Sequence, residues 1–293
     1  MDIDGDIVAA ARTHLDAAGV TGVRVVCADG WGGDAEDAPY DRIVLTVGGH
    51  DISPTWPAQL ATGGRLLLPL SLPAVQACIA FDKRDAWLES VSVHGCNFMR
   101  LRGVAALPMR RVAIGPEPAP IVWPRGTHEV DGGAVHAFLH APGEHLASAL
   151  VVPEDELYDG LVAWLGLHEP RSAWLTAHGK AVARGLVPAL LGEGNELAST
   201  FGIFESDGLA MFIRVTTAPD AADGRVAIGI RTHGNPNVGE RLRIAALGWD
   251  EAGRPSLAGL RVRAYPIEYP YHPAAREIVV TRPYTRFALD WPP

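Results

Sequence analysis

The sequence predicts an α/β fold that begins with an open sheet and continues into an α+β domain. Strand-like apolar runs alternate with helical patterns over the first third of the chain, which is typical of an open α/β sheet. From about Gly103 the chain becomes proline-rich. With 293 residues, 48% of them hydrophobic, it is long enough for two domains. We expect one domain over 1–103 and another over 126–293, with a proline-rich linker over 104–125.

The first expected element is an amphipathic helix over Asp6–Ala18. Its apolar residues recur at helical spacing, acids cluster in its first turn, and Gly19 follows as a C-cap. Short apolar runs over Val23–Ala28 and Asp41–Val47 then predict two strands. The second run is continuous, as in a strand buried on both faces of a parallel sheet.

The remaining elements of the first domain follow in quick succession. A short helix is expected over Trp56–Ala61, a turn at Gly63-Gly64 and a strand over Arg65–Leu70. The runs Gln76–Asp82 and Trp87–Val93, joined by "KRD", predict an antiparallel pair.

The second domain mixes helical patterns and strand runs without strict alternation, which indicates an α+β arrangement. We expect helices over Leu157–Leu167, Gly179–Leu191 and Val238–Leu247, a turn at Glu251–Arg254, and strands over Gly208–Thr216, Val226–Ile230 and Leu260–Tyr265.

Composition excludes several classes of partner. A net charge of −9 disfavours a nucleic acid, which is held largely by basic residues. The three cysteines show no CxxC spacing, which favours buried, reduced thiols. The N-terminus has no basic region, and no apolar stretch is long enough to span a bilayer. We expect a cytoplasmic protein without a nucleic-acid or membrane partner.

Acids at strand ends are the first candidate site. In open α/β sheets, ligands lie at the carboxyl ends of the strands. Asp2 (or Asp4) precedes the first helix, and Asp29 ends the next apolar run. The first acid could accept both ribose hydroxyls of a nucleoside, and the second could accept the exocyclic amine of adenine. Alternatively, Asp2 and Asp4 only begin a helix and Asp29 only caps a turn.

Five stretches, in this order and spacing, resemble the protein-L-isoaspartate (D-aspartate) O-methyltransferase family. They are "DIDGDIVAAARTHLDAAGV", "ADGWGG", "APYDRIVLT", "ISPTWPAQLATGGRLLLPL" and "CNFMRLRG". The resemblance covers about residues 2–103, and the string from Ala38 to Leu70 is its most specific part. It implies a Rossmann-like class I methyltransferase sheet and S-adenosyl-L-methionine as the cofactor.

The resemblance also implies roles for particular residues, although it identifies no catalytic residue and no metal ligand. Arg100 stands where the family usually has proline, which leaves the substrate contact open. The implied positions are Asp2 for the ribose, Asp29 and Gly30 for the adenine, Asp41 beside the sulfonium, Pro54 and Gln59 as structural residues, and Cys96, Asn97, Phe98 and Met99 beside a peptide substrate.

One family motif is not found. A GxGxGY loop after the first strand normally surrounds the methionine part of the cofactor, and this sequence does not contain it. We therefore expect a partial sheet that lacks its N-terminal strand and helix, from a gene model begun too far downstream, a split polypeptide or a degenerate protein. The chain alone is expected to be inactive, and a separate N-terminal methyltransferase fragment is a possible partner.

The C-terminal half contains "GLVAWLGLHEPRSAWL", "GIFESDGLAMFIR" and "LGWDEAGRPSLAGLRVRAYP". These resemble the extra domain of long actinobacterial-type homologues associated with lanthipeptide gene clusters, which implies peptide recognition. Two hypotheses follow. The chain is part of an S-adenosylmethionine-dependent carboxyl O-methyltransferase that modifies L-isoaspartate or aspartate in a damaged protein or precursor peptide. Alternatively, it is a non-catalytic peptide-binding or partner-complementing module derived from such an enzyme.

Two further patterns were considered. His136 and His140, with Glu144 and His145, have one spacing suited to a metal, but "HAPGEH" breaks a helix there, which favours loop and strand histidines. Residues 233–239 precede a helix and would suit either an anion or a tight connection. The sequence contains no GxSxG motif, so it does not indicate a serine hydrolase of that type.

Overall fold

The chain folds into two compact units. This computed structural model describes residues 1–106, 110–124, 128–192, 196–215 and 224–292. The first unit comprises residues 1–72, 76–108 and 260–293, and the second comprises 73–75 and 109–259. Residues 260–293 thus join the N-terminal residues, whereas the sequence analysis grouped them with the rest of the C-terminal half.

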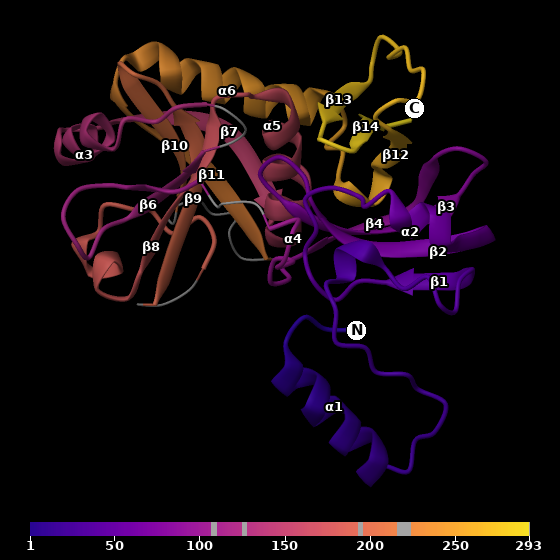
Figure 1. The fold of residues 1–293 in the computed structure, drawn as a ribbon. Helices are drawn as coiled ribbons and strands as arrows, with labels where there is room; N and C mark the ends of the chain where they lie inside the picture. Colours follow the sequence, from indigo (N-terminus) through magenta and orange to yellow (C-terminus); the bar gives the residue numbers. More distant parts are fainter. Residues whose placement is uncertain (107–109, 125–127, 193–195, 216–223, 293) are drawn as a thin grey trace. The chain divides into compact units, whose positions relative to one another are not determined.

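The first unit is built on a mixed sheet, which in the described residues has the strand order β1-β2-β3-β4-β12-β14-β13 (Figure 1). Only β1 and β2 pair in parallel, and all other neighbours are antiparallel. The strands are β1 (Tyr40–Val44), β2 (Leu60–Ser71), β3 (Gln76–Lys83), β4 (Leu88–Cys96), β12 (Arg261–Pro266), β13 (Ile278–Thr281) and β14 (Thr285–Asp290). The helices are α1 (Gly5–Ala17) and α2 (Thr55–Gln59), with a 3-10 turn at Gly30–Gly32.

β1 is an edge strand, so the prediction that Asp41–Val47 is buried on both faces is wrong. Among the described residues β1 pairs with β2 alone. Val44 is 59% exposed, and Asp41 and Arg42 are also exposed. A continuous apolar run therefore does not prove burial on both faces of a sheet.

Residues Val23–Ala28 do not form the expected strand. Their backbone makes one parallel bridge, in which the Asp2 N–H donates to Val26 O at 3.1 Å and the Ala28 N–H donates to Asp2 O at 3.0 Å. A single bridge does not extend into a strand. Cys27 is exposed as a result, contrary to the expected buried thiol.

The expected turn at Gly63-Gly64 instead lies inside β2. Gly63 has a φ of 72°, and the β1–β2 register shifts between Tyr40 and Arg42, so the strand absorbs the glycines as an irregularity without ending. The predicted pairing of β3 with β4 is confirmed.

The core of the first unit forms on β2, β3 and β14. Leu66, Leu68 and Leu70 alternate along β2 and are fully buried, as the period of two in a strand requires. Ile79 on β3 and Leu289 on β14 are also fully buried. The C-terminal strands therefore contribute to the same core as the N-terminal ones.

The second unit has its own antiparallel sheet, with the order β5-β6-β8-β9-β10-β11-β7 in the described residues. Figure 1 shows α6 along this sheet, where it contacts β7, β9, β10 and β11. The strands are β5 (Val112–Ala113), β6 (Ile121–Pro124), β7 (Glu144–Pro153), β8 (Ser172–His178), β9 (Leu197–Phe204), β10 (Gly208–Arg214) and β11 (Arg225–Gly234). The helices are α3 (Gly132–His140), α4 (Glu154–Glu156), α5 (Ala163–His168) and α6 (Pro236–Glu251).

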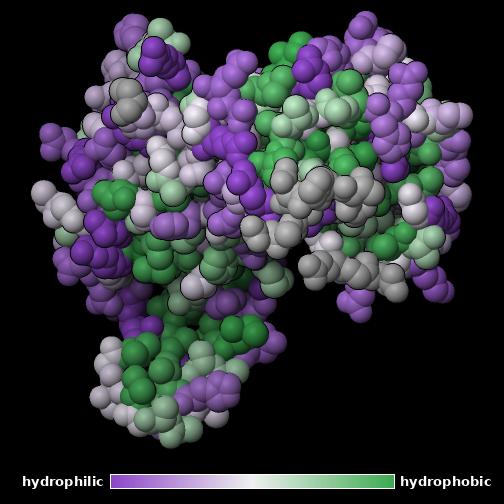
Figure 2. Space-filling model, turned by 180° about the vertical axis from the view of Figure 1, so that it is seen from behind, coloured by the Kyte–Doolittle hydropathy of each residue, from purple (hydrophilic) through white to green (hydrophobic). Residues whose placement is uncertain are grey.

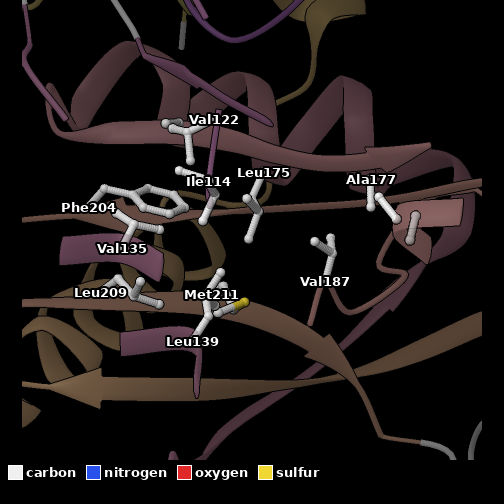
Figure 3. Close-up of a cluster of buried hydrophobic side chains, with 13 residues drawn as sticks. Ile114, Val122, Val135, Leu139, Leu175, Ala177, Val187, Phe204, Leu209 and Met211 are labelled. Carbon is white, nitrogen blue, oxygen red and sulfur yellow. The ribbon is translucent and has the colours of Figure 1, made fainter. Parts of the chain in front are cut away.

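An apolar cluster on one face of this sheet stabilises the second unit. Figure 3 shows side chains from several strands and from α3 pointing into it, among them Val135, Phe204 and Met211. All three are at most 2% exposed. Burial of such side chains contributes about 1.5–3 kcal/mol each.

Several predictions for the second unit are confirmed, and one is wrong. A helical segment covers Leu157–Leu167 through a π-helical turn and α5, and strands form at β10 and β11 close to the expected bounds. The expected strand Leu260–Tyr265 also forms, as β12, but in the sheet of the first unit. The second expected helix, Gly179–Leu191, is only a 3-10 turn, because the chain then becomes extended and Leu191 bridges to Ser199. In the described part of the chain, no helix is both long and apolar enough to cross a membrane.

Candidate functional site

The first unit contains a cavity of about 330 Å³ beside β1. Two of the predicted cofactor residues, Asp2 and Gly30, lie in its wall, whereas Asp29 and Asp41 do not. Its lining residues are Met1, Asp2, Ile3, Gly30, Gly33, Asp34, Tyr40, Arg42, Ile43, Val44, Leu45, Thr46, Val47, Trp56, Gln59, Arg100, Leu101 and Arg102. The cavity thus joins the N-terminal segment to the carboxyl end of β1.

Asp2 enters this cavity with spare acceptor capacity. Its Oδ1 accepts the Asp4 N–H at 3.0 Å and lies 4.0 Å from a guanidinium nitrogen of Arg102. Arg102 pairs more closely with Asp4, which raises the pKa of Arg102. A carboxylate offers about four lone-pair positions, so Asp2 can still accept ligand hydroxyls.

The Asp29 carboxylate is directed at backbone amides. One oxygen accepts the Trp31 N–H at 2.9 Å, and the other accepts the Val104 N–H at 2.8 Å. Asp29 therefore caps the 3-10 turn at Gly30–Gly32, as one of the two interpretations expected. Its contact with an adenine stays a prediction.

The loop that presents Gly30 is held in place by α2. Trp56 donates its indole N–H to Gly30 O at 2.9 Å, and its ring packs against Trp31 at 5.3 Å between centroids. Gln59 accepts the Asp34 N–H at 2.9 Å. This wall of the cavity is therefore fixed by Trp56 and by Gln59, and the resemblance placed only Gln59 of these two, as a structural position.

The predicted substrate segment lies beside the end of β1. Met99 O accepts the Gly48 N–H at 2.7 Å. Phe98 is 41% and Met99 is 84% exposed, and Asn97 is also exposed, while Cys96 is half-buried. The segment presents apolar side chains to solvent, and its contact with a substrate stays a prediction.

Asp41 is exposed at the start of β1, away from the carboxyl end at which ligands of parallel strands bind. The structure therefore does not bring Asp41 into the cavity wall with Asp2, and its place beside a sulfonium remains only an expectation.

Three basic residues near the carboxyl end of β1, His50, Arg100 and Arg282, were not predicted as a group from the sequence. Burial, and then the charges of Arg282 and Arg100, lower the pKa of His50 to about 4. Burial also lowers the pKa of Arg282, and the Asp51 carboxylate opposes that shift. These residues are far apart along the chain, so no spacing pattern could have connected them.

The other two patterns have structural explanations. His136 and His140 lie on α3 with ring centroids 4.3 Å apart in a tilted arrangement, so they are helix residues and not loop or strand residues. The helix ends at His140, where "HAPGEH" begins, as expected. The described residues contain no group of three or more His, Cys, Asp or Glu side chains placed to hold a metal. At the start of α6, Asn235 accepts the Asn237 N–H at 3.0 Å and donates to Asp207 at 2.8 Å, which forms a tight connection.

Residues 2–105 match the model of the family described as protein-L-isoaspartate (D-aspartate) O-methyltransferase. Two curated relatives are both named protein-L-isoaspartate O-methyltransferase. The one from Methanoculleus marisnigri is 39% identical over 98 residues, and the one from Koribacter versatilis is 35% identical over 98 residues. The N-terminal third of this chain is therefore similar to carboxyl methyltransferases.

Each match covers only part of this chain and only part of the relative. The match covers 33% of this chain and 44% of either relative. A solved structure titled protein-L-isoaspartate O-methyltransferase aligns over 89% of this chain and 62% of its own, with 19% identity and a TM-score of 0.36. That likeness is too low to support an argument.

Substitution of Gly33 tests the packing of the cavity wall. Gly33 has a φ of 62°, and a Cβ there would lie 2.1 Å from Gln59 Oε1. Gly22 has a φ of 83°, but its Cβ would meet nothing within 4 Å. Both changes to Ala carry left-handed strain of about 1–2 kcal/mol. We expect Gly33→Ala to lower the free energy of unfolding by about 1 kcal/mol more than Gly22→Ala, because the Gln59 hydrogen bond is lost. Equal losses in urea unfolding would contradict this packing.

The lowered pKa of His50 predicts a pH-dependent stability. Its pKa is about 4 in the folded protein against an ordinary value of 6.5. Between these values the unfolded chain binds the extra proton, so the free energy of unfolding falls as the pH drops from 6.5 towards 4. His50→Gln should reduce this fall by about 1–2 kcal/mol, after allowance for solvent screening.

The measurement is urea unfolding of both proteins at about pH 4.5 and about pH 7. His272→Gln, at an exposed histidine, is the control and should behave as the parent. If His50→Gln and the parent lose the same stability, the environment assigned to His50 is wrong.

Proposed function

We propose, from the match of residues 2–105 to carboxyl methyltransferases, that the first unit binds the adenosyl part of S-adenosyl-L-methionine. The proposed reaction class is O-methylation of an L-isoaspartate or aspartate carboxyl in a protein or peptide. One observation carries this proposal. Asp2 and Gly30, which the resemblance assigns to the ribose and the adenine, reach a single cavity of about 330 Å³. That volume lies within the usual range of small-molecule sites.

The residues of the cavity fit an adenosine. The Asp2 carboxylate can accept ribose hydroxyls, and Gly30, which the resemblance assigns to the adenine, lies in the same wall. Apolar side chains such as Val44, Leu45 and Leu101 form the remaining wall. When bound, S-adenosyl-L-methionine would supply the methyl group that is transferred.

Three arginines in the same wall affect which ligand binds. Arg42, Arg100 and Arg102 line the cavity, and each would repel a nearby sulfonium cation by about 1 kcal/mol in water. The neutral thioether of S-adenosylhomocysteine avoids this repulsion. We therefore expect the chain alone to bind S-adenosylhomocysteine more tightly than S-adenosyl-L-methionine, and to show no measurable turnover.

The protein side of the reaction requires mostly alignment. A substrate carboxylate is already ionised at neutral pH, so no general base is needed. Alignment of reacting groups can account for about 7–11 kcal/mol of a barrier. Exposed Phe98 and Met99 beside the end of β1 are suited to contact a peptide. The residues from 126 onward are proposed to help recognise a damaged protein or a precursor peptide.

A second candidate function is supported by the open edge of β1. Met1, Ile3, Val23 and Val44 are all at least 40% exposed on the N-terminal part of the chain. Figure 2 shows hydrophobic side chains on the surface of this part. An unpaired apolar edge favours addition of another strand. In this alternative the chain is a partner-complementing module, and a separate N-terminal methyltransferase fragment supplies the strand.

Calorimetry with S-adenosylhomocysteine tests the first candidate. Asp2→Asn removes a charged acceptor, so we expect binding to weaken at least about tenfold. Asp16→Asn, at the exposed end of α1, is the matched control and should bind as the parent does. Equal affinity of Asp2→Asn and the parent, or no binding by the parent, would refute an adenosyl site at Asp2.

Blocking the edge of β1 tests the second candidate. The Leu45 N–H donates to Leu67 O in β2 at 2.9 Å, so the Val44 N–H faces the open side. The probe is a peptide with the pattern that the resemblance implies, a strand followed by a GxGxGY loop. Val44→Pro should bind it at least about tenfold more weakly than the parent, whereas Val44→Thr, which keeps the amide, should not. If the parent does not bind the peptide, strand addition at this edge is excluded.

A further inference from the structure

Three segments of the first unit meet at the carboxyl end of β1. The Gly48 N–H donates to Met99 O at 2.7 Å, and the Leu101 N–H donates to Gly48 O at 2.9 Å. This bridge places Arg100 directly beside Gly48, two residues before His50. The loop after β1 and the segment after β4 are therefore in register at this point.

Buried Asp51 brings the third segment to the same place. Its Oδ1 accepts the Ile52 N–H at 2.8 Å, and its Oδ2 accepts the Tyr284 N–H at 2.8 Å. The Arg282 N–H donates to Thr285 O at 2.8 Å, which closes a tight turn around Tyr284. Arg282 is thereby held near His50, although the two residues are distant in sequence.

The charges of this cluster are not balanced by its own acid. Asp51 is 5% exposed, and its two oxygens are already engaged with backbone amides. Arg282 Nε is buried and has no hydrogen-bond partner. A buried donor without a partner costs about 1–3 kcal/mol. The cluster therefore offers an unused, buried cationic donor to an incoming anion.

We infer that His50, Arg100 and Arg282 form an anion site that accepts a peptide carboxylate at the carboxyl end of β1. The planar guanidinium of Arg282 can donate its free Nε–H and a neighbouring N–H to both oxygens of one carboxylate. Arg100 supplies a second positive charge from the opposite segment. Neither Arg282 nor His50 belongs to the stretch that implied a substrate contact.

The position of Arg100 connects this site to the proposed methyl transfer. Arg100 also lines the cavity of about 330 Å³, whereas His50 and Arg282 do not, so Arg100 is the residue that the cluster shares with the cavity. The identity of the anion as a peptide carboxylate rests on the proposed function. The anion site itself rests on the backbone contacts that bring the three segments together and on the unpartnered Nε of Arg282.

The test is calorimetric binding of two peptides that differ at one residue. One peptide contains a single isoaspartyl residue, the other contains asparagine there, and both have blocked ends. We expect the isoaspartyl peptide to bind the parent, and to bind Arg282→Met and Arg100→Met at least about tenfold more weakly. Exposed Arg276→Met removes the same charge elsewhere in the unit and should bind as the parent does. The asparagine peptide should not bind.

Three additional measurements test the geometry of the site, its occupation and the folding of the variants. Arg282→Lys keeps the positive charge but not the two-pronged geometry, so its affinity should lie between those of the parent and Arg282→Met. Bound carboxylate should also raise the pKa of His50 from about 4, which nuclear magnetic resonance of the labelled ring can follow. Urea unfolding of each variant identifies any that fail to fold, and Arg282→Lys then replaces Arg282→Met in the comparison.

Several outcomes would overturn the inference. Equal affinity of the parent and both Met variants would do so, as would an unchanged pKa of His50. If inorganic phosphate binds through Arg282 and the isoaspartyl peptide does not, the site takes a phosphate and the assignment to a peptide carboxylate is wrong. S-adenosylhomocysteine binding separates the two proposals. If the parent does not bind S-adenosylhomocysteine, the proposed function fails. Binding of the isoaspartyl peptide to the parent and to Arg282→Met decides the anion site alone.

Discussion

The buried carboxylate of Asp51 is the constraint on which the inferred anion site depends. It accepts the Ile52 and Tyr284 amides, both at 2.8 Å, and so fixes the loop after β1 to the turn before β14. Charge-assisted bonds of this kind are about twice as strong as neutral ones, and a buried carboxylate without them would be costly. Without this link, residues 260–293 could still pair with β4, but Arg282 would not be held near His50.

Among the described residues, the sheet of the first unit ends in an edge strand on both sides, β13 on one and β1 on the other. Beyond β4, the C-terminal strands extend the sheet in the order β12, β14 and β13. At the other end, β1 has an unpaired edge, and its Val44 is exposed. The cavity lies beside this edge, so a ligand or an added strand would complete the same wall. This explains why both candidate functions use the same residues.

The sequence predicted the local elements well where their periodicity was strong. Helix α1 and the β3–β4 pair followed from short-range pattern. The ribose role of Asp2 came from the resemblance and stays a prediction. Two features depended on distant contacts and could not be predicted. An apolar run such as Asp41–Val47 predicts burial whether or not other residues cover it. Arg282 becomes part of the inferred anion site only because the Tyr284 amide binds Asp51.

An adenosyl ligand bound between the N-terminal segment and β1 would protect the amides of the cavity wall. Hydrogen–deuterium exchange with and without S-adenosylhomocysteine measures this protection. We predict slower exchange at the amides of Asp2, Gly33 and Val47, with no change along β10 of the second unit. Unchanged exchange at these cavity amides, or protection confined to β10, would rule out an adenosyl ligand in this cavity.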